Sequence, residues 1–190
     1  LVLELINRGA SATAFHETLE NYVTVEIFSK LSAEQKRVLS ALSIFREPVS
    51  IDALSEQQLN IDTLDSLVEQ GLARQVDSEI YDVHDLIREF LLRSIDDQTK
   101  FELHAKCSNW YKKSSQTPGF TIELIFHLLS SDNMVDAADM IIDNGRVLIS
   151  QGHMELLGLI ESINIADISE EMLAKILQFK GEILSLLGRF

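Results

Sequence analysis

Hydrophobic residues recur three and four positions apart along most of this chain, and this spacing predicts amphipathic helices. Ser11 is placed to cap a first helix that runs to about Lys30. A second helix follows at once, because Ser32-Ala33-Glu34-Gln35 is a capping box and an apolar stripe comes after it. The stripe consists of Val38, Leu39, Leu42 and Phe45. The beginning of the chain is therefore predicted to be helical.

Shorter elements are predicted in the next part of the chain. An extended segment leads to Ser50, which caps a short helix, and a longer helix begins at Asn60 and ends at Gly71. Two strands then form a hairpin. The strands are Ala73 to Val76 and Glu79 to Val83, joined by a turn at Asp77-Ser78. Helix, short strand, two helices and a hairpin are the order of elements in a winged helix.

Helical spacing returns in the second half. The polar Asp96-Asp97-Gln98 marks a joint, a further helix follows it, and the segment from Ser114 to Gly119 is loose. Ile122 to Ile142, with a turn at Ser131-Asp132-Asn133, predicts a helical hairpin.

A second helical pair is predicted from Val147 through Gly152 to Ile163, and a third helix from Ser169 to Gly188. This last helix has the leucine and glycine spacing of a tetratricopeptide-like unit. The residues concerned are Leu177, Gly181, Leu184, Leu187 and Gly188. The second half is therefore predicted to be the beginning of an α-solenoid, and the chain is expected to be a fragment of a longer protein.

The predicted fold class is mainly α, with a winged-helix domain that carries a small β-hairpin, followed by an α-solenoid of tetratricopeptide-like helical hairpins. We place a helical segment at residues 1–29, the winged helix at 30–97 and the helical repeats at 98–190.

Composition narrows the function. The 190 residues carry a formal net charge of −14, so nucleic acid is a poor candidate partner, because binding its phosphates needs clustered Lys and Arg. No apolar run is long enough to span a membrane, and the first residues lack the pattern of a signal peptide. The one cysteine, Cys107, excludes an internal disulfide and fits a reducing compartment, so we expect a cytoplasmic protein.

Histidines provide the candidate chemistry. His84 lies where the second predicted strand gives way to a helix, and an imidazole at a helix N-terminus can add a donor to a bound phosphate. The alternative is an ordinary helix cap or a packed surface histidine. His104 and Cys107 are three residues apart on a predicted helix. They are either half of a zinc site or a buried thiol beside a surface histidine. Because no second pair of ligands is nearby, we expect no metal.

Three segments in order resemble the winged-helix module of STAND signalling ATPases of the NB-ARC/AP-ATPase type. They are Leu31 to Phe45, Leu64 to Leu72, and Tyr81 to Leu86. Leu1 to Leu5 resembles the helix after that family's GLPL motif, so residues 1–29 are expected to end a preceding ATPase or helical domain. Ile122 to Ile142 is similar to the first repeat of the family's helical sensor.

The resemblance implies a function. In that family a P-loop domain holds ADP or ATP with Mg²⁺, and the winged helix closes over the nucleotide in an inactive state. His84 matches the histidine of the MHD-like motif, which contacts the ADP phosphate, and Asp85 matches the following acid, although Val83 stands where the motif has methionine. Asp82 and Asp85 are expected to oppose phosphate binding, so a lysine and Mg²⁺ from the nucleotide-binding domain would supply the balancing charge.

The expected role is thus regulation and protein interaction rather than catalysis. The chain has no glycine-rich phosphate loop, so we expect no enzymatic activity, no catalytic residues and no cofactor of its own, while the parent chain would bind ADP or ATP. The expected partners are the preceding nucleotide-binding domain of the same chain and a protein or small-molecule ligand on the repeats.

Two alternatives remain open. One is a DNA-binding winged-helix regulator, against which the helix before the hairpin carries Asp62, Asp65 and Glu69 and no Lys or Arg. The hairpin itself sets one cation, Arg74, against three acids. The other is a helical-repeat adaptor unrelated to any ATPase, which would not explain the order of elements in the first half.

Overall fold

The computed structural model describes residues 28–55, 57, 59–114 and 117–189, and these form two compact units that divide between Ile95 and Asp96. The boundary predicted from the sequence lies after residue 97. The predicted helix from Ser11 lies outside the described residues, apart from a short 3-10 turn at its end, and so does Leu1 to Leu5.

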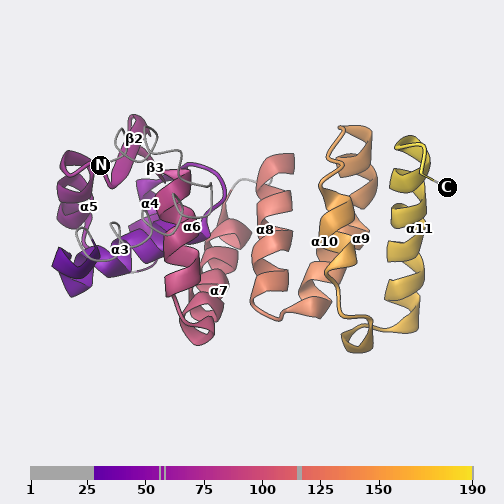
Figure 1. Cartoon of the computed structure of the whole chain (residues 1–190). Helices are drawn as coiled ribbons and strands as arrows, with labels where there is room; N and C mark the ends of the chain where they lie inside the picture. Colours follow the sequence, from indigo (N-terminus) through magenta and orange to yellow (C-terminus); the bar gives the residue numbers. More distant parts are fainter. Residues whose placement is uncertain (1–27, 56, 58, 115–116, 190) are drawn as a thin grey trace, which may run out of the picture. The chain divides into compact units, whose positions relative to one another are not determined.

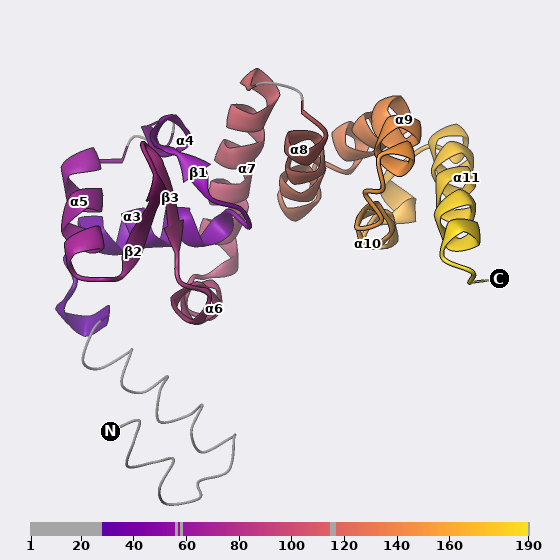
Figure 2. The ribbon, with the colours of Figure 1, turned by 90° about the horizontal axis from the view of Figure 1, so that it is seen from above.

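The first unit combines helices with a small sheet (Figure 1). Its elements are η2 (Phe28–Lys30), α3 (Ala33–Ile44), β1 (Val49–Ser50), α4 (Ile51–Ser55), α5 (Ile61–Glu69), β2 (Ala73–Asp77), β3 (Ile80–Val83) and α6 (Asp85–Ser94). Helix, short strand, two helices and a hairpin thus occur in the predicted order. The sheet is antiparallel in the order β1-β3-β2, so β3 lies in the middle (Figure 2).

Helix α3 is the centre of this unit, because α5, α6 and β3 all pack against it. The predicted capping box is confirmed: the Gln35 N–H donates to the Ser32 hydroxyl at 3.1 Å, and the Ser32 N–H donates to the Gln35 side chain at 2.9 Å. The predicted stripe of Val38, Leu39, Leu42 and Phe45 is buried. A cap that satisfies the first N–H groups and a buried stripe behind it together explain why the helix forms here.

The predicted end of α5 is also confirmed. Gly71 has φ +71°, which a side chain would disfavour, and the Leu72 N–H donates back to the Leu67 carbonyl at 2.9 Å. The hairpin turn differs by one residue from the prediction. Strand β2 continues to Asp77 through an irregularity after Gln75, so the turn falls on Ser78 and Glu79, with Glu79 at φ +62°.

The second unit consists of α7 (Asp97–Lys113), α8 (Pro118–Ser130), α9 (Met134–Ser150), α10 (Leu156–Glu161), η3 (Ile165–Asp167) and α11 (Glu170–Leu186). Helix α8 packs against α7, α9 and α10, and α9 packs against α11. The predicted hairpin of α8 and α9 and the predicted helix after Ser169 are therefore present. The mainly α fold class with a small antiparallel sheet is confirmed.

Two boundaries in the second unit were predicted wrongly. Val147 does not begin a second helical pair, because α9 continues unbroken to Ser150 and only the short α10 follows before Ile163. The segment predicted as loose up to Gly119 ends earlier. Thr117 caps α8 by accepting from the Phe120 N–H at 3.3 Å, and Pro118 occupies the first turn, where a missing N–H costs nothing.

Helix α9 contains Gly145 at a position where the Phe179 ring of α11 packs on its backbone. A Cβ on Gly145 would lie 2.9 Å from Cε2 of the Phe179 ring. Gly145 and Phe179 are both buried. The glycine therefore lets the Phe179 ring lie directly on the backbone of α9.

Helices α7 and α8 are joined by a buried pair of histidines. Nδ1 of His104 and Nδ1 of His127 are 2.9 Å apart, so one ring donates a hydrogen bond to the other. The His127 ring stacks on Tyr111, with centroids 5.4 Å apart, and has no exposed surface. His104 is buried too, so the surface histidine of the alternative reading is wrong. Burial first, and the nearby Lys100 ammonium second, lower the pKa of His104 from 6.5 to about 4.

Replacing Gly145 with alanine is expected to lower the free energy of unfolding of the second unit by about 1–3 kcal/mol, because the new methyl group displaces the Phe179 ring. Gly181→Ala is the matched control, since a Cβ on Gly181 meets no described atom within 4 Å. Alanine there should raise stability by up to about 1 kcal/mol through helix propensity. Urea unfolding curves measure both values, and equal effects of the two substitutions would contradict the close contact.

The stability of the second unit should fall on acidification. Since the folded pKa of His104 is below its unfolded value, the unfolded chain takes up the proton first, and stability that is complete above pH 6.5 is lost as the pH falls toward 4. Linkage gives a loss of roughly 2 kcal/mol between pH 7 and pH 5. Denaturant unfolding across that range measures it. His104→Gln should flatten this dependence, and an unchanged slope in that variant would exclude His104 as its source.

Candidate functional site

The corner between β3 and α6 carries the candidate residue His84. The strand ends at Val83, the helix begins at Asp85, and His84 is the N-cap residue between them with extended dihedrals of φ −60° and ψ 135°. Its carbonyl accepts the Arg88 N–H at 2.9 Å, so the backbone of His84 begins α6. The side chain is exposed and makes no capping hydrogen bond within the described structure. The imidazole is therefore accessible to a ligand from outside this unit.

Asp85 occupies the first helical position of α6 and is exposed. An acid in the first turn of a helix is stabilised by the partial positive charge of the unpaired N–H groups. Asp85 thus has a structural reason to be there, and the supporting role that the resemblance assigns to it stays a prediction.

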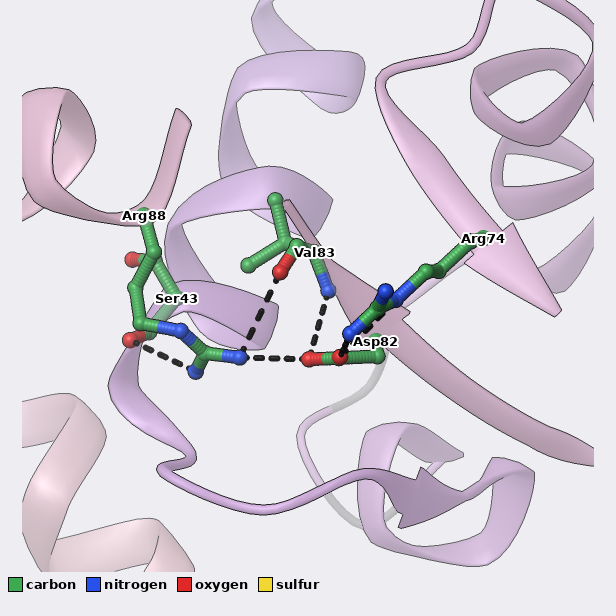
Figure 3. Close-up of polar contacts among 5 residues, drawn as sticks. All are labelled: Ser43, Arg74, Asp82, Val83 and Arg88. Carbon is green, nitrogen blue, oxygen red and sulfur yellow. Dashed lines mark hydrogen bonds and ion pairs between the residues drawn. The ribbon is translucent and has the colours of Figure 1, made fainter. Parts of the chain in front are cut away.

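Asp82 is the buried charge behind this corner, with 4% of its surface exposed. Arg74 from β2 and Arg88 from α6 both donate to its carboxylate, one to each oxygen (Figure 3). Arg74 reaches Oδ2 through Nε at 3.0 Å and also through Nη2. The Val83 N–H donates to Oδ1 at 2.8 Å. A buried carboxylate needs a charged partner and hydrogen bonds to offset its lost hydration.

Arg88 connects three elements through one guanidinium. It donates to Asp82 and to the Val83 carbonyl of β3, the latter at 3.4 Å, and a longer contact of 3.5 Å reaches the Ser43 carbonyl of α3 (Figure 3). Only 14% of its side chain is exposed. Because Arg88 lies one turn after His84, these contacts fix the start of α6, and with it the backbone of His84, against the sheet.

Arg74 has a different environment from Arg88. It lies opposite Asp82 in the antiparallel register of β2 and β3, and 54% of its side chain is exposed. The hydrogen bond to Asp82 and the charge of that carboxylate raise the pKa of Arg74 above its ordinary value, and the charge of Asp85 adds to this. Arg74 is therefore a permanently charged, solvent-accessible group beside the corner.

The structure corrects one electrostatic expectation. From the sequence, Asp82 and Asp85 are expected to oppose a phosphate near His84. In the structure, Asp82 is paired with two guanidinium groups, so Asp82, Asp85, Arg74 and Arg88 together carry no net charge, whereas the two acids alone carry −2. Sequence reasoning missed Arg88, although its spacing of four residues from His84 on a predicted helix was a signal that could have identified it.

The other candidate pair consists of His104 and Cys107, and both are buried. Cys107 lies one turn after His104, which hydrogen-bonds to His127 and also lies against the Phe126 ring. Among the residues that the structure describes, no three His, Cys, Asp or Glu side chains form a group that could hold a metal ion. In the same part of the chain, no helix is long and apolar enough to cross a membrane.

Comparison with known proteins gives a structural match without a sequence match. Neither the protein-family models nor the curated proteins include one that matches this chain. Among solved structures, the chain is similar to the crystal structure of a Signal Transduction ATPase with Numerous Domains (STAND) protein with a tetratricopeptide repeat sensor from Pyrococcus horikoshii. The TM-score is 0.65 at 22% sequence identity, and the match covers 98% of this chain and 32% of that protein. At this level of identity the likeness shows a shared fold, over about a third of the length of the archaeal protein.

Proposed function

We propose that this chain is a regulatory and protein-interaction region of a STAND-type signalling ATPase of the NB-ARC/AP-ATPase class. In this proposal the first unit is a winged helix that helps hold an ADP-bound inactive state, and the helices of the second unit sense a ligand or a partner protein. The order of elements in the first unit and the likeness to a STAND protein with a repeat sensor support it.

The observation that carries the proposal is the exposed imidazole of His84 at the N-terminus of α6, which follows a strand whose buried Asp82 is paired with two arginines. Helix N-termini favour anions, and an imidazole N–H can donate to a phosphate oxygen. His84 is the residue of this chain that we assign to the ADP phosphate, with Asp85 in support. The nucleotide-binding domain of the same protein would contribute the P-loop lysine and Mg²⁺, which supply most of the positive charge.

A hydrogen bond of this kind is strong enough to matter for signalling. Hydrogen bonds to charged groups contribute about 1.5–3 kcal/mol. A free energy of that size shifts a two-state equilibrium by one to two decades. The proposed consequence is that His84 favours the closed, ADP-bound arrangement until a ligand on the repeats favours the open one. The active site for hydrolysis would lie in the nucleotide-binding domain.

The charges on α5 disfavour the DNA-binding alternative. Asp62, Asp65 and Glu69 are all exposed on this helix, which would have to enter the major groove. Three carboxylates in that position would repel the phosphate backbone. The helical-repeat adaptor therefore remains the alternative to be tested.

The test is ADP binding by a longer chain that includes the preceding nucleotide-binding domain. His84→Ala is expected to weaken ADP affinity by about 10- to 100-fold, the loss of one charge-assisted hydrogen bond. Isothermal titration calorimetry measures the affinity, and the nucleotide carried through purification gives an independent value. His153→Ala, which changes a histidine in the second unit, is the matched control and should bind ADP like the wild type.

Either of two results would contradict the proposal. Equal ADP affinity in the wild type and His84→Ala would remove the histidine from the nucleotide contact. No bound nucleotide in any form of the longer chain would exclude the ATPase reading and leave an acidic helical-repeat adaptor.

A further inference from the structure

Two guanidinium groups share one carboxylate at the corner that carries His84. Asp82 accepts from Arg88 at Oδ1 and from Arg74 at Oδ2, so the three side chains together hold one positive charge in excess. Asp82 keeps Arg88 and the Val83 N–H as donors when Arg74 is taken away. Arg74 can therefore leave Asp82 without stranding a buried, unpaired charge.

The two arginines are unequal in their freedom to move. The side chain of Arg88 is 14% exposed and its guanidinium contacts backbone carbonyls of two other elements, whereas the side chain of Arg74 is 54% exposed. Water reaches the guanidinium of Arg74, so this cation can be hydrated when it leaves the carboxylate, whereas the buried guanidinium of Arg88 would lose its partners without replacement. Arg74 is thus the arginine of this cluster that can exchange its partner.

The register of the hairpin places Arg74 close to the corner that carries His84. Arg74 pairs with Asp82 across β2 and β3, and β3 ends one residue later, so His84 directly follows the paired segment. The charge of Asp85, the residue after His84, acts on Arg74 and helps to raise its pKa. An anion contacted by the imidazole would therefore lie near the Arg74 guanidinium.

We propose that Arg74 is a second phosphate-binding side chain beside His84, held on Asp82 until a phosphate oxygen replaces the carboxylate. The ligand class is a phosphate group of a nucleotide. Arginine suits this exchange, because its planar fork donates to two oxygens of a phosphate as readily as to a carboxylate. This inference rests on the proposed function, since it adds a residue to the same site. It also gives Asp82 a second role as an internal competitor of the phosphate.

The experiment compares nucleotides that differ in phosphate number on the longer chain with its nucleotide-binding domain. Arg74→Ala should weaken ADP binding about tenfold and leave adenosine binding unchanged, because the arginine contacts only phosphate. Inorganic phosphate, added as a competitor, should lose affinity for the variant as ADP does. It should therefore displace ADP no better from the variant than from the wild type. The matched control is Arg93→Ala, which removes an exposed arginine of α6 that pairs with Glu89. Arg93→Ala should leave both affinities unchanged.

A variant of Asp82 separates the two roles. Asp82→Asn releases Arg74 from its carboxylate but also loosens the contacts that position His84, so ADP affinity should fall less than in Arg74→Ala, which removes the phosphate-binding side chain itself. Circular dichroism and thermal melting identify the folded variants, and Arg74→Ala decides the inference if Asp82→Asn does not fold. A fall in ADP affinity in folded Asp82→Asn as large as that in Arg74→Ala would overturn the exchange.

The failure of this inference can be told apart from the failure of the proposed function. If His84→Ala weakens ADP binding and Arg74→Ala does not, the proposed function stands and the role of Arg74 is wrong. If Arg74→Ala weakens adenosine and ADP equally, the arginine does not act through phosphate, and the inference is again wrong. If neither substitution changes ADP affinity, the nucleotide site itself is absent from this corner.

Discussion

The first unit depends on one buried carboxylate. Removing a carboxylate from water costs several kcal/mol unless it is paired and hydrogen-bonded. Asp82 meets that requirement with donors from β2, from α6 and from the backbone of its own strand. Each donor comes from a different segment, so satisfying this single charge fixes the edge of the hairpin, the end of β3 and the start of α6 together. The position of His84 follows from this arrangement, because it is the residue between β3 and α6.

The second unit is held by contacts of another kind. Its helices meet through close packing, as where the Phe179 ring lies against Gly145, and through the one hydrogen bond between His104 and His127 inside an aromatic cluster. Such a core is sensitive to added volume and to protonation. The buried polar groups of the two units therefore differ, a paired carboxylate in the first and a pair of histidines in the second.

The sequence predicts features that depend on near neighbours. The capping box at Ser32 and the glycine end of α5 at Gly71 are both correct, because their hydrogen bonds join residues within five positions of each other. The predicted boundary before Val147 was wrong, because Gly145 lies inside α9 rather than at its end. The ring that packs on this glycine belongs to Phe179, which is far along the chain. The histidine pair could not be foreseen for the same reason, as its members lie 23 residues apart on separate helices.

The charge cluster at His84 shows why net charge is a poor guide to a single site. The chain carries a net charge of −14, and the acids nearest to His84 in the sequence predict repulsion of a phosphate. Charges beyond about 8 Å are largely screened at physiological salt, so the groups that decide are the few in direct contact. Here those groups include two arginines that reach the corner from different elements, one across the hairpin and one from the following helix. An acidic protein can therefore keep a corner in which acidic and basic side chains balance, and here that balance includes a solvent-accessible cation, Arg74.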